Sequence, residues 1–259
     1  AAGNFPIQMK ALFTTLFHWR PERDTLLALT AGLVSVALSL AMVPLERWPW
    51  ASTIVRDLLQ VFAVGVLLPV FHIRRSVGGV AAFGLSMRKG PLFLAINLVL
   101  AILLLFQFVR STPPPAGFVW DAAATWKAAY VVLTVTFECL FFYAFLRTLL
   151  ERAFGAVAGI ALAALFYSFH HAGFQPEFAK LFFVGVLYAT VFRLGSSALL
   201  IWPFFLAVGG IYDVLINSKV VAAIQHVEIR TLVLAVLFAI VAVWIGRSPD
   251  AISDRPVRH

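Results

Sequence analysis

Charged residues are scarce in this chain: they make up 12% of its 259 residues, whereas 62% of the residues are hydrophobic. In soluble domains about a quarter of the residues are charged, so this composition excludes an ordinary soluble domain. The apolar residues gather in runs of about 20 residues, the length that an α-helix needs to cross a bilayer. The sequence therefore predicts an all-α, polytopic membrane protein surrounded by lipid.

Cysteine is almost absent, since Cys139 is the only one. A single thiol excludes an internal disulfide framework and a cysteine-rich metal site. The formal net charge of +8 does not indicate a nucleic-acid partner, because the basic residues stand singly or in pairs between apolar runs and form no stripe for phosphates. Repeats, low-complexity tails and long linkers are also lacking, so residues 1–259 are expected to form one transmembrane domain.

About eight spanning helices are expected, preceded by an N-terminal helix in the membrane interface. Residues 5–19 are apolar but interrupted by Lys10 and His18, which favours a helix that lies on the membrane with Phe13, Phe17 and Trp19 toward the acyl chains. The predicted spans are residues 25–44, 53–72, 91–110, 128–150, 155–171, 178–193, 197–216 and 230–247.

The basic residues favour an arrangement with both termini in the cytoplasm, because cytoplasmic loops carry an excess of Lys and Arg. In this arrangement the cytoplasmic side holds Lys10, Arg20, Arg23, Arg74, Arg75, Arg88, Lys89, Arg147, Arg152, Arg193, Arg247, Arg255 and Arg258. The other side holds only Arg47, Arg56, Arg110, Lys127, Lys180, Lys219 and Arg230. Asp57 is expected to form a local ion pair with Arg56 at a helix mouth.

Glu138 stands in the middle of an otherwise apolar helix, and a carboxyl group at that depth is a candidate for function. His170 and His171 end the next apolar segment, after a polar turn at Glu151 and Arg152. With a rise of about 1.5 Å per residue, Glu138 lies roughly 18–20 Å and His170 roughly 22–24 Å from that turn. The two side chains are therefore expected at nearly the same depth, open away from the cytoplasm or sideways to lipid.

The segments FECLFFYAFL, which contains Glu138, and FYSFH, which ends at His170, resemble motifs of the CPBP family. This family comprises the CAAX-prenyl proteases and bacteriocin-processing proteins, eight-helix intramembrane endopeptidases that depend on glutamate. Its first motif is EExxxR and its second is FxxxH at the end of the next helix. The segment LFFVGVLYATVFRLGSS and the upstream VAAFGLSMRKGPL are similar to the family too, so the resemblance covers about residues 80–213.

Two departures concern the first motif: Cys139 replaces its second Glu, and Tyr143 replaces its Arg. Positions four residues apart adjoin on a helix face, so the two family residues are expected to form an ion pair there. Replacement of both leaves no orphan charge, and such an exchange is often tolerated. Cys139 is expected to be a small buried apolar residue, with a nucleophile activated by His170 as the alternative.

A third departure is the loss of the family's HxxxN motif, whose residues would help to hold water and stabilise the oxyanion. The corresponding stretch reads PFFLAVGGIYD, where Tyr212 and Asp213 are the only polar residues. Loss of an oxyanion donor lowers a peptidase's rate by about two to three orders of magnitude. His226 substitutes for the missing histidine only if its loop folds back into the site.

The resemblance implies direct attack by water, with Glu138 as general base and His170 orienting the water or protonating the leaving amine. It implies no cofactor. A carboxylate and two histidines also suit zinc, but His171 follows His170 directly and would point about 100° away on a continuing helix, so no metal site is predicted. The structural alternatives are a hydrogen bond from Glu138 to Thr134 or Tyr143, and histidines that merely mark a helix end.

Two functions from different classes follow from these residues. One is an intramembrane endopeptidase, a hydrolase of the CPBP type, that acts on a hydrophobic or membrane-anchored peptide. The other is an accessory subunit or scaffold that kept the fold, lost the chemistry and binds another integral membrane protein. Both place the chain in a membrane, which the resemblance indicates to be the inner, cytoplasmic membrane of a bacterium.

Overall fold

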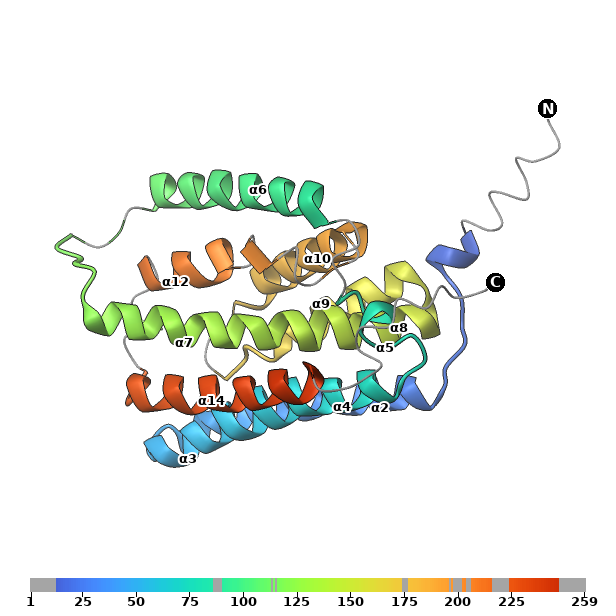
Figure 1. Ribbon diagram of the computed structural model, residues 1–259, viewed down its shortest axis with the longest axis horizontal. Helices are drawn as coiled ribbons and strands as arrows, with labels where there is room; N and C mark the ends of the chain where they lie inside the picture. Colours follow the sequence, from blue (N-terminus) through green and yellow to red (C-terminus); the bar gives the residue numbers. More distant parts are fainter. Residues whose placement is uncertain are drawn as a thin grey trace.

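The computed structural model describes residues 13–85, 90–112, 114, 116–173, 177–195, 197, 202–203, 206–215 and 224–246. The regular secondary structure of this part of the chain is helical, which confirms the predicted all-α fold. Long helices lie side by side in a layered bundle (Figure 1). In chain order, with η for π-helical segments, they are α2 (Arg23–Leu45), α3 (Pro49–Thr53), η1 (Ile54–Leu67), α4 (Leu68–Arg75), α5 (Gly79–Ala82), α6 (Gly90–Ser111), α7 (Ala122–Glu138), η2 (Cys139–Leu146), α8 (Arg147–Phe154), α9 (Ala156–Phe169), α10 (Phe178–Gly195), η3 (Leu206–Ile211), α12 (Tyr212–Leu215) and α14 (Val227–Gly246).

Among the described residues, six helical runs are long and apolar enough to cross a membrane, as expected of an integral membrane protein. Each corresponds to one of the predicted spans, and each is apolar enough to be covered by lipid. The six runs are Arg23–Leu45, Pro49–Arg75, Gly90–Ser111, Ala122–Phe154, Phe178–Gly195 and Val227–Ile245.

The other two predicted spans differ from these six. The span predicted at residues 155–171 is α9, an apolar helix of 14 residues that is shorter than a full crossing. The span predicted at residues 197–216 lies largely outside the described residues, and only η3, α12 and a few neighbouring residues of it are described. The count of eight therefore stays a prediction.

The described part of the N-terminal segment is a short helical turn at residues 13–16 that leads to the end of α8. Phe13 and Trp19 are exposed, as an interfacial segment requires. The backbone N–H of His18 donates to the carbonyl of Phe154 (3.2 Å), and its ring Nε2 lies 2.8 Å from the carbonyl of Arg152. These contacts attach the segment to the bundle; residues 1–12 lie outside the described part.

The centre of the bundle is one continuous helix of 33 residues, formed by α7, η2 and α8 and drawn in green across Figure 1. Residues 141–146 of it have no exposed surface. The prediction of a turn at Glu151 and Arg152 is wrong, because both residues lie within α8. The chain reverses at Gly155 instead, whose φ of +88° favours glycine and whose Cα faces the backbone of Leu16.

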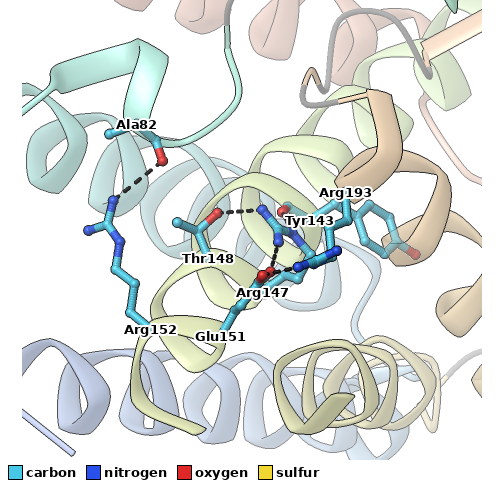
Figure 2. A network of polar contacts seen from close by, with 7 residues as sticks. All are labelled: Ala82, Tyr143, Arg147, Thr148, Glu151, Arg152 and Arg193. Carbon is cyan, nitrogen blue, oxygen red and sulfur yellow. Dashed lines mark hydrogen bonds and ion pairs between the residues drawn. The ribbon is translucent and has the colours of Figure 1, made fainter. Parts of the chain in front are cut away.

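Glu151 stays in the helix because two arginines neutralise it inside the bundle (Figure 2). Its carboxylate accepts hydrogen bonds from Arg147 Nη1 and from Arg193 Nε of α10, the latter at 2.8 Å. Arg147 also donates to the carbonyl of Tyr143 (3.0 Å) and to the hydroxyl of Thr148 (2.8 Å). Because two guanidinium groups neutralise its carboxylate, Glu151 can lie inside the bundle and does not have to stand in a solvent-exposed turn. The network also joins α8 to α10.

Two glycines allow neighbouring helices to approach the centre. A Cβ at Gly32 of α2 would lie 2.7 Å from ring atoms of Phe166 in α9. A Cβ at Gly65 of η1 would overlap the ring of Phe137, the residue before Glu138. Small residues permit such close packing between membrane helices, and here they fix the aromatic neighbours of Glu138 and of the α9 terminus.

Gly65→Ala is therefore expected to destabilise the protein by about 1–3 kcal/mol, the usual cost of overpacking a filled interior. Thermal unfolding of the purified protein in mild detergent measures the change. Gly90→Ala is the matched control, because a Cβ at Gly90 has nothing within 4 Å. Equal unfolding temperatures for the two variants would show that Phe137 is not confined by η1.

Candidate functional site

Glu138 is the last residue of α7, at the point where the central helix changes from α-helical to π-helical geometry. Its neighbours along the helix are apolar: Phe137 precedes it and residues 139–142 follow it. The Glu138 side chain is 12% exposed. A π-helical turn inside a long helix often accompanies a functional site, and here it begins directly after the acidic side chain.

His170 and His171 lie at the opposite face of the site, where α9 ends. The last α-helical residue is Phe169, and the chain then turns through residues 170–173. Gly173 closes this turn: its N–H donates to the hydroxyl of Ser39 in α2 (3.0 Å), and its Cα packs against the Ser39 backbone. A side chain at position 173 would push the turn away from α2, so glycine here helps to place both histidines.

The carbonyl oxygen of Tyr167 holds both imidazole rings. It lies 2.7 Å from His170 Nδ1 and 2.8 Å from His171 Nδ1. A carbonyl oxygen only accepts hydrogen bonds, so each Nδ1 carries the proton and donates. A neutral imidazole with its proton on Nδ1 has a free electron pair on Nε2. The end of α9 therefore fixes both tautomers, with the proton of each ring on Nδ1.

Both Nε2 atoms face the same carboxylate oxygen. Oε1 of Glu138 lies 3.5 Å from Nε2 of His170 and 3.8 Å from Nε2 of His171. The ligand atoms of the three residues all lie within 4.8 Å of one another. The predicted approach of Glu138 and His170 is thus confirmed, and His171, a supporting residue in the sequence analysis, belongs to the same group.

Aromatic side chains surround the two histidines. The His170 ring centroid is 4.6 Å from that of Phe142 and 6.0 Å from that of Phe137, and the His171 ring is 4.8 Å from Tyr167. The side chains of His170 and His171 are 1% and 6% exposed, so Glu138, at 12%, is the most accessible of the three. A substrate or an ion would therefore reach the group from the Glu138 side.

The expectation that the two histidines cannot point to one ion is wrong. It assumed a helix that continues through residue 171, in which successive side chains diverge by about 100°. In the structure α9 ends before His170, and the two rings meet edge to face with centroids 3.9 Å apart. These three residues are the group in the described part of the chain that could hold a metal ion.

Cys139 and Tyr143, which replace the second Glu and the Arg of the first motif, are both buried. Cys139 is a free, buried cysteine. It directly follows Glu138, and adjacent helix positions do not face each other. Tyr143 is also buried, with its ring 5.7 Å from that of Tyr167 and 5.8 Å from that of Tyr188. Both therefore pack beside the site, with Tyr143 in an aromatic cluster.

Two of the residues considered in place of the third motif, Tyr212 and His226, are not part of the group. Tyr212 packs its ring 5.1 Å from that of Phe108 in α6. His226 is exposed and stacks on Trp50, with ring centroids 4.7 Å apart and planes inclined by 8°. The loop therefore does not fold back as the substitution required. Asp213 is the second residue of α12, and its side chain lies outside the described part of the chain.

A second buried polar cluster was not predicted. Asp57, 2% exposed, binds Arg230 of α14 in a two-pronged contact of 2.7 and 2.8 Å, and its expected pair with Arg56 stays a prediction. Tyr130 of α7 donates to Asp57 (2.6 Å) and lies 2.7 Å from Arg230. This cluster holds η1, α7 and α14 together. In the sequence, its only signal was the presence of charged residues at positions 57 and 230, close to apolar segments.

Fold and composition together define an all-helical integral membrane protein with a buried Glu–His–His group. Comparison with models of known protein families, with curated proteins and with solved structures finds no match.

Proposed function

We propose that this protein is an intramembrane peptide hydrolase of the type that the CPBP-like motifs suggest. The observation that carries the proposal is the convergence of Glu138 with two histidines, whose Nε2 atoms lie 3.5 and 3.8 Å from Oε1 of Glu138. Such a group suits the activation of water, since a general base must lie within about one water molecule of the proton that it removes.

In the proposed reaction a water molecule sits between Glu138 Oε1 and the imidazole Nε2 atoms. The water's oxygen forms a bond to the peptide carbonyl carbon while one of its protons passes to Glu138. The C–N bond then breaks, and the proton passes to the leaving nitrogen, directly from Glu138 or through His170. The products are a carboxylic acid and an amine, and no covalent enzyme intermediate is formed.

The substrate of the proposed hydrolase is a hydrophobic or membrane-anchored peptide. The six apolar helices have surfaces that suit lipid, so a peptide that partitions into the bilayer is the substrate proposed. In the proposed topology both termini are cytoplasmic, which places the Arg147–Glu151–Arg193 network at the cytoplasmic end and the Asp57–Arg230 cluster at the opposite end. A bacterial inner membrane is the proposed location.

A role as an accessory subunit is the second candidate. The specific observation in its favour is the position of Tyr212 and His226, which contact Phe108 and Trp50 and supply no oxyanion donor beside Glu138. A chain of this kind would copurify with another integral membrane protein in a fixed ratio, and the complex would persist when Glu138 or His170 is substituted.

The hydrolase proposal is tested in proteoliposomes with membrane-anchored peptides and water enriched in oxygen-18. Mass spectrometry is expected to find one labelled oxygen in the new carboxyl terminus of each product, because water supplies that atom. His170→Ala is expected to lower the cleavage rate by about two orders of magnitude or more, the lower range for loss of a proton-transfer group.

His226→Ala is the control for this experiment, since it removes a histidine that is exposed and outside the group. It is expected to cleave at the wild-type rate. Equal cleavage by His170→Ala and wild type would remove the assigned role of His170, and failure of the folded protein to cleave any peptide in a broad membrane-anchored set would favour the accessory subunit.

A further inference from the structure

The group at Glu138 brings together one carboxylate oxygen and one nitrogen of each of two imidazoles, all within 4.8 Å of one another. The Nδ1 protons of both histidines are directed at the Tyr167 carbonyl, so both Nε2 atoms present lone pairs to Oε1 of Glu138. A carboxylate oxygen and two imidazole nitrogens that converge in this way are ligands that metal ions use in proteins. The arrangement therefore points to a cation as well as to a water molecule.

We infer that Glu138, His170 and His171 bind a divalent transition-metal ion, with Zn²⁺ as the preferred ion. This inference deepens the proposed function by naming a cofactor for the same site, and its hydrolytic part rests on that function. Two imidazole nitrogens and one carboxylate oxygen form the ligand set of catalytic zinc sites, in which a water molecule takes the fourth position.

The observed distances suit such an ion. Ligand atoms about 2.0–2.1 Å from zinc in tetrahedral directions lie about 3.3–3.4 Å from one another. The two separations between Oε1 and Nε2 are 3.5 and 3.8 Å, and the whole ligand set lies within 4.8 Å. The two separations from Oε1 are thus only slightly longer than those in a tetrahedral site.

The surroundings supply the second requirement of a zinc site, which is fixed imidazole orientation. A metal-bound histidine usually donates its other ring N–H to a carbonyl or carboxylate, which sets the tautomer. Both histidines already do so through the single carbonyl of Tyr167. The aromatic rings of Phe142 and Tyr167 pack against the imidazoles, and so limit their rotation away from Glu138.

A bound ion would also change how the proposed hydrolysis proceeds. A zinc ion polarises a peptide carbonyl and lowers the pKa of its bound water to about 7. Its positive charge would thus stabilise the developing oxyanion, a role for which this sequence lacks the family's third motif. Glu138 would bind the ion through Oε1, and its second oxygen would be the acceptor for the water's proton.

The test measures metal binding without any substrate. The full chain is purified in mild detergent through an affinity tag without histidine, treated with a chelator, loaded with zinc and desalted. Elemental analysis is expected to find one zinc per chain in the wild type and none in the His170→Ala/His171→Ala double variant. His226→Ala is the matched control and is expected to retain one zinc, because His226 is stacked on Trp50.

X-ray absorption of zinc in the wild-type protein gives a second readout that does not depend on a variant's folding. The expected spectrum contains two imidazole ligands and oxygen ligands at about 2.0–2.1 Å. A folded wild type that retains no zinc, a double variant that retains it, or a spectrum with fewer than two imidazoles would each overturn the inference.

These outcomes are separable from those of the hydrolysis test. Zinc bound in the expected ratio by a protein that cleaves no peptide would leave the metal site standing and remove the proposed function. Full cleavage by chelator-treated protein that retains no zinc would leave the function standing and remove the metal.

Discussion

Glu138→Gln is expected to lower peptide hydrolysis by about two to four orders of magnitude, the contribution of a positioned general acid–base group. Glutamine has nearly the same shape as glutamate, so the packing of α7 against the histidines is expected to stay the same. Its amide does not take up a proton from water, and its N–H group donates to an imidazole Nε2 instead. The rate of product formation in proteoliposomes, per folded protein, measures the loss.

Glu177→Gln is the matched control, because it makes the same chemical change at an exposed carboxylate paired with Lys180. It is expected to leave the rate unchanged. Size-exclusion profiles and unfolding temperatures show whether both variants are folded. Cleavage by Glu138→Gln at the rate of the control would contradict the role of Glu138 in either form of the mechanism, as base or as metal ligand.

The approach of Glu138 to His170 was predictable because the two lie at equal depth on helices joined by a short connection. The connection itself was misplaced, since Arg147 and Arg193 keep the polar residue Glu151 inside α8, and Arg152 donates to the carbonyl of Ala82. This error had little effect on the predicted depths, because the true turn at Gly155 lies only a few residues after the predicted turn at Glu151 and Arg152. An error of one helical turn is about 5.4 Å, too small to separate the side chains.

The role of His171 could not be derived from helix periodicity, since it depends on where α9 ends. Gly173 was the available signal, because glycine often follows the last residues of a helix. The sequence gives no indication that one carbonyl, that of Tyr167, receives both rings. The contact of Tyr212 with Phe108 and the stacking of His226 on Trp50 are tertiary too, and no local pattern specifies them.

The Asp57–Arg230 pair shows a second limit of sequence reasoning, because its members are separated by 173 positions. Adjacent charges such as Arg56 and Asp57 suggest a local pair, yet neighbouring helix positions point in different directions. Burial then requires a partner from another helix for Asp57. Depth alone restricts that partner to the same end of the bundle, and the packing of α14 beside α7, which Figure 1 shows, makes Arg230 the partner.

Asp57→Ala is expected to destabilise the protein by about 3–5 kcal/mol, because it leaves the charge of Arg230 buried without its carboxylate. The side chains of Asp57 and Arg230 are 3% and 10% exposed, so water cannot fully hydrate an unpaired charge at either residue. Tyr130 also loses its hydrogen-bond acceptor. Unfolding in detergent, followed by temperature or denaturant, measures the difference from wild type.

A double variant separates the unpaired charge from the simple loss of a contact. Asp57→Ala combined with Arg230→Met removes both charges, and such a replacement of a buried pair by apolar groups is often nearly neutral. We expect the double variant to recover most of the stability lost in Asp57→Ala. Because the cluster shares no residue with the Glu138–His170–His171 group, the recovered protein is also expected to cleave or bind zinc like the wild type. A double variant as unstable as Asp57→Ala would mean that the pair itself, rather than the avoidance of an isolated charge, holds these helices together.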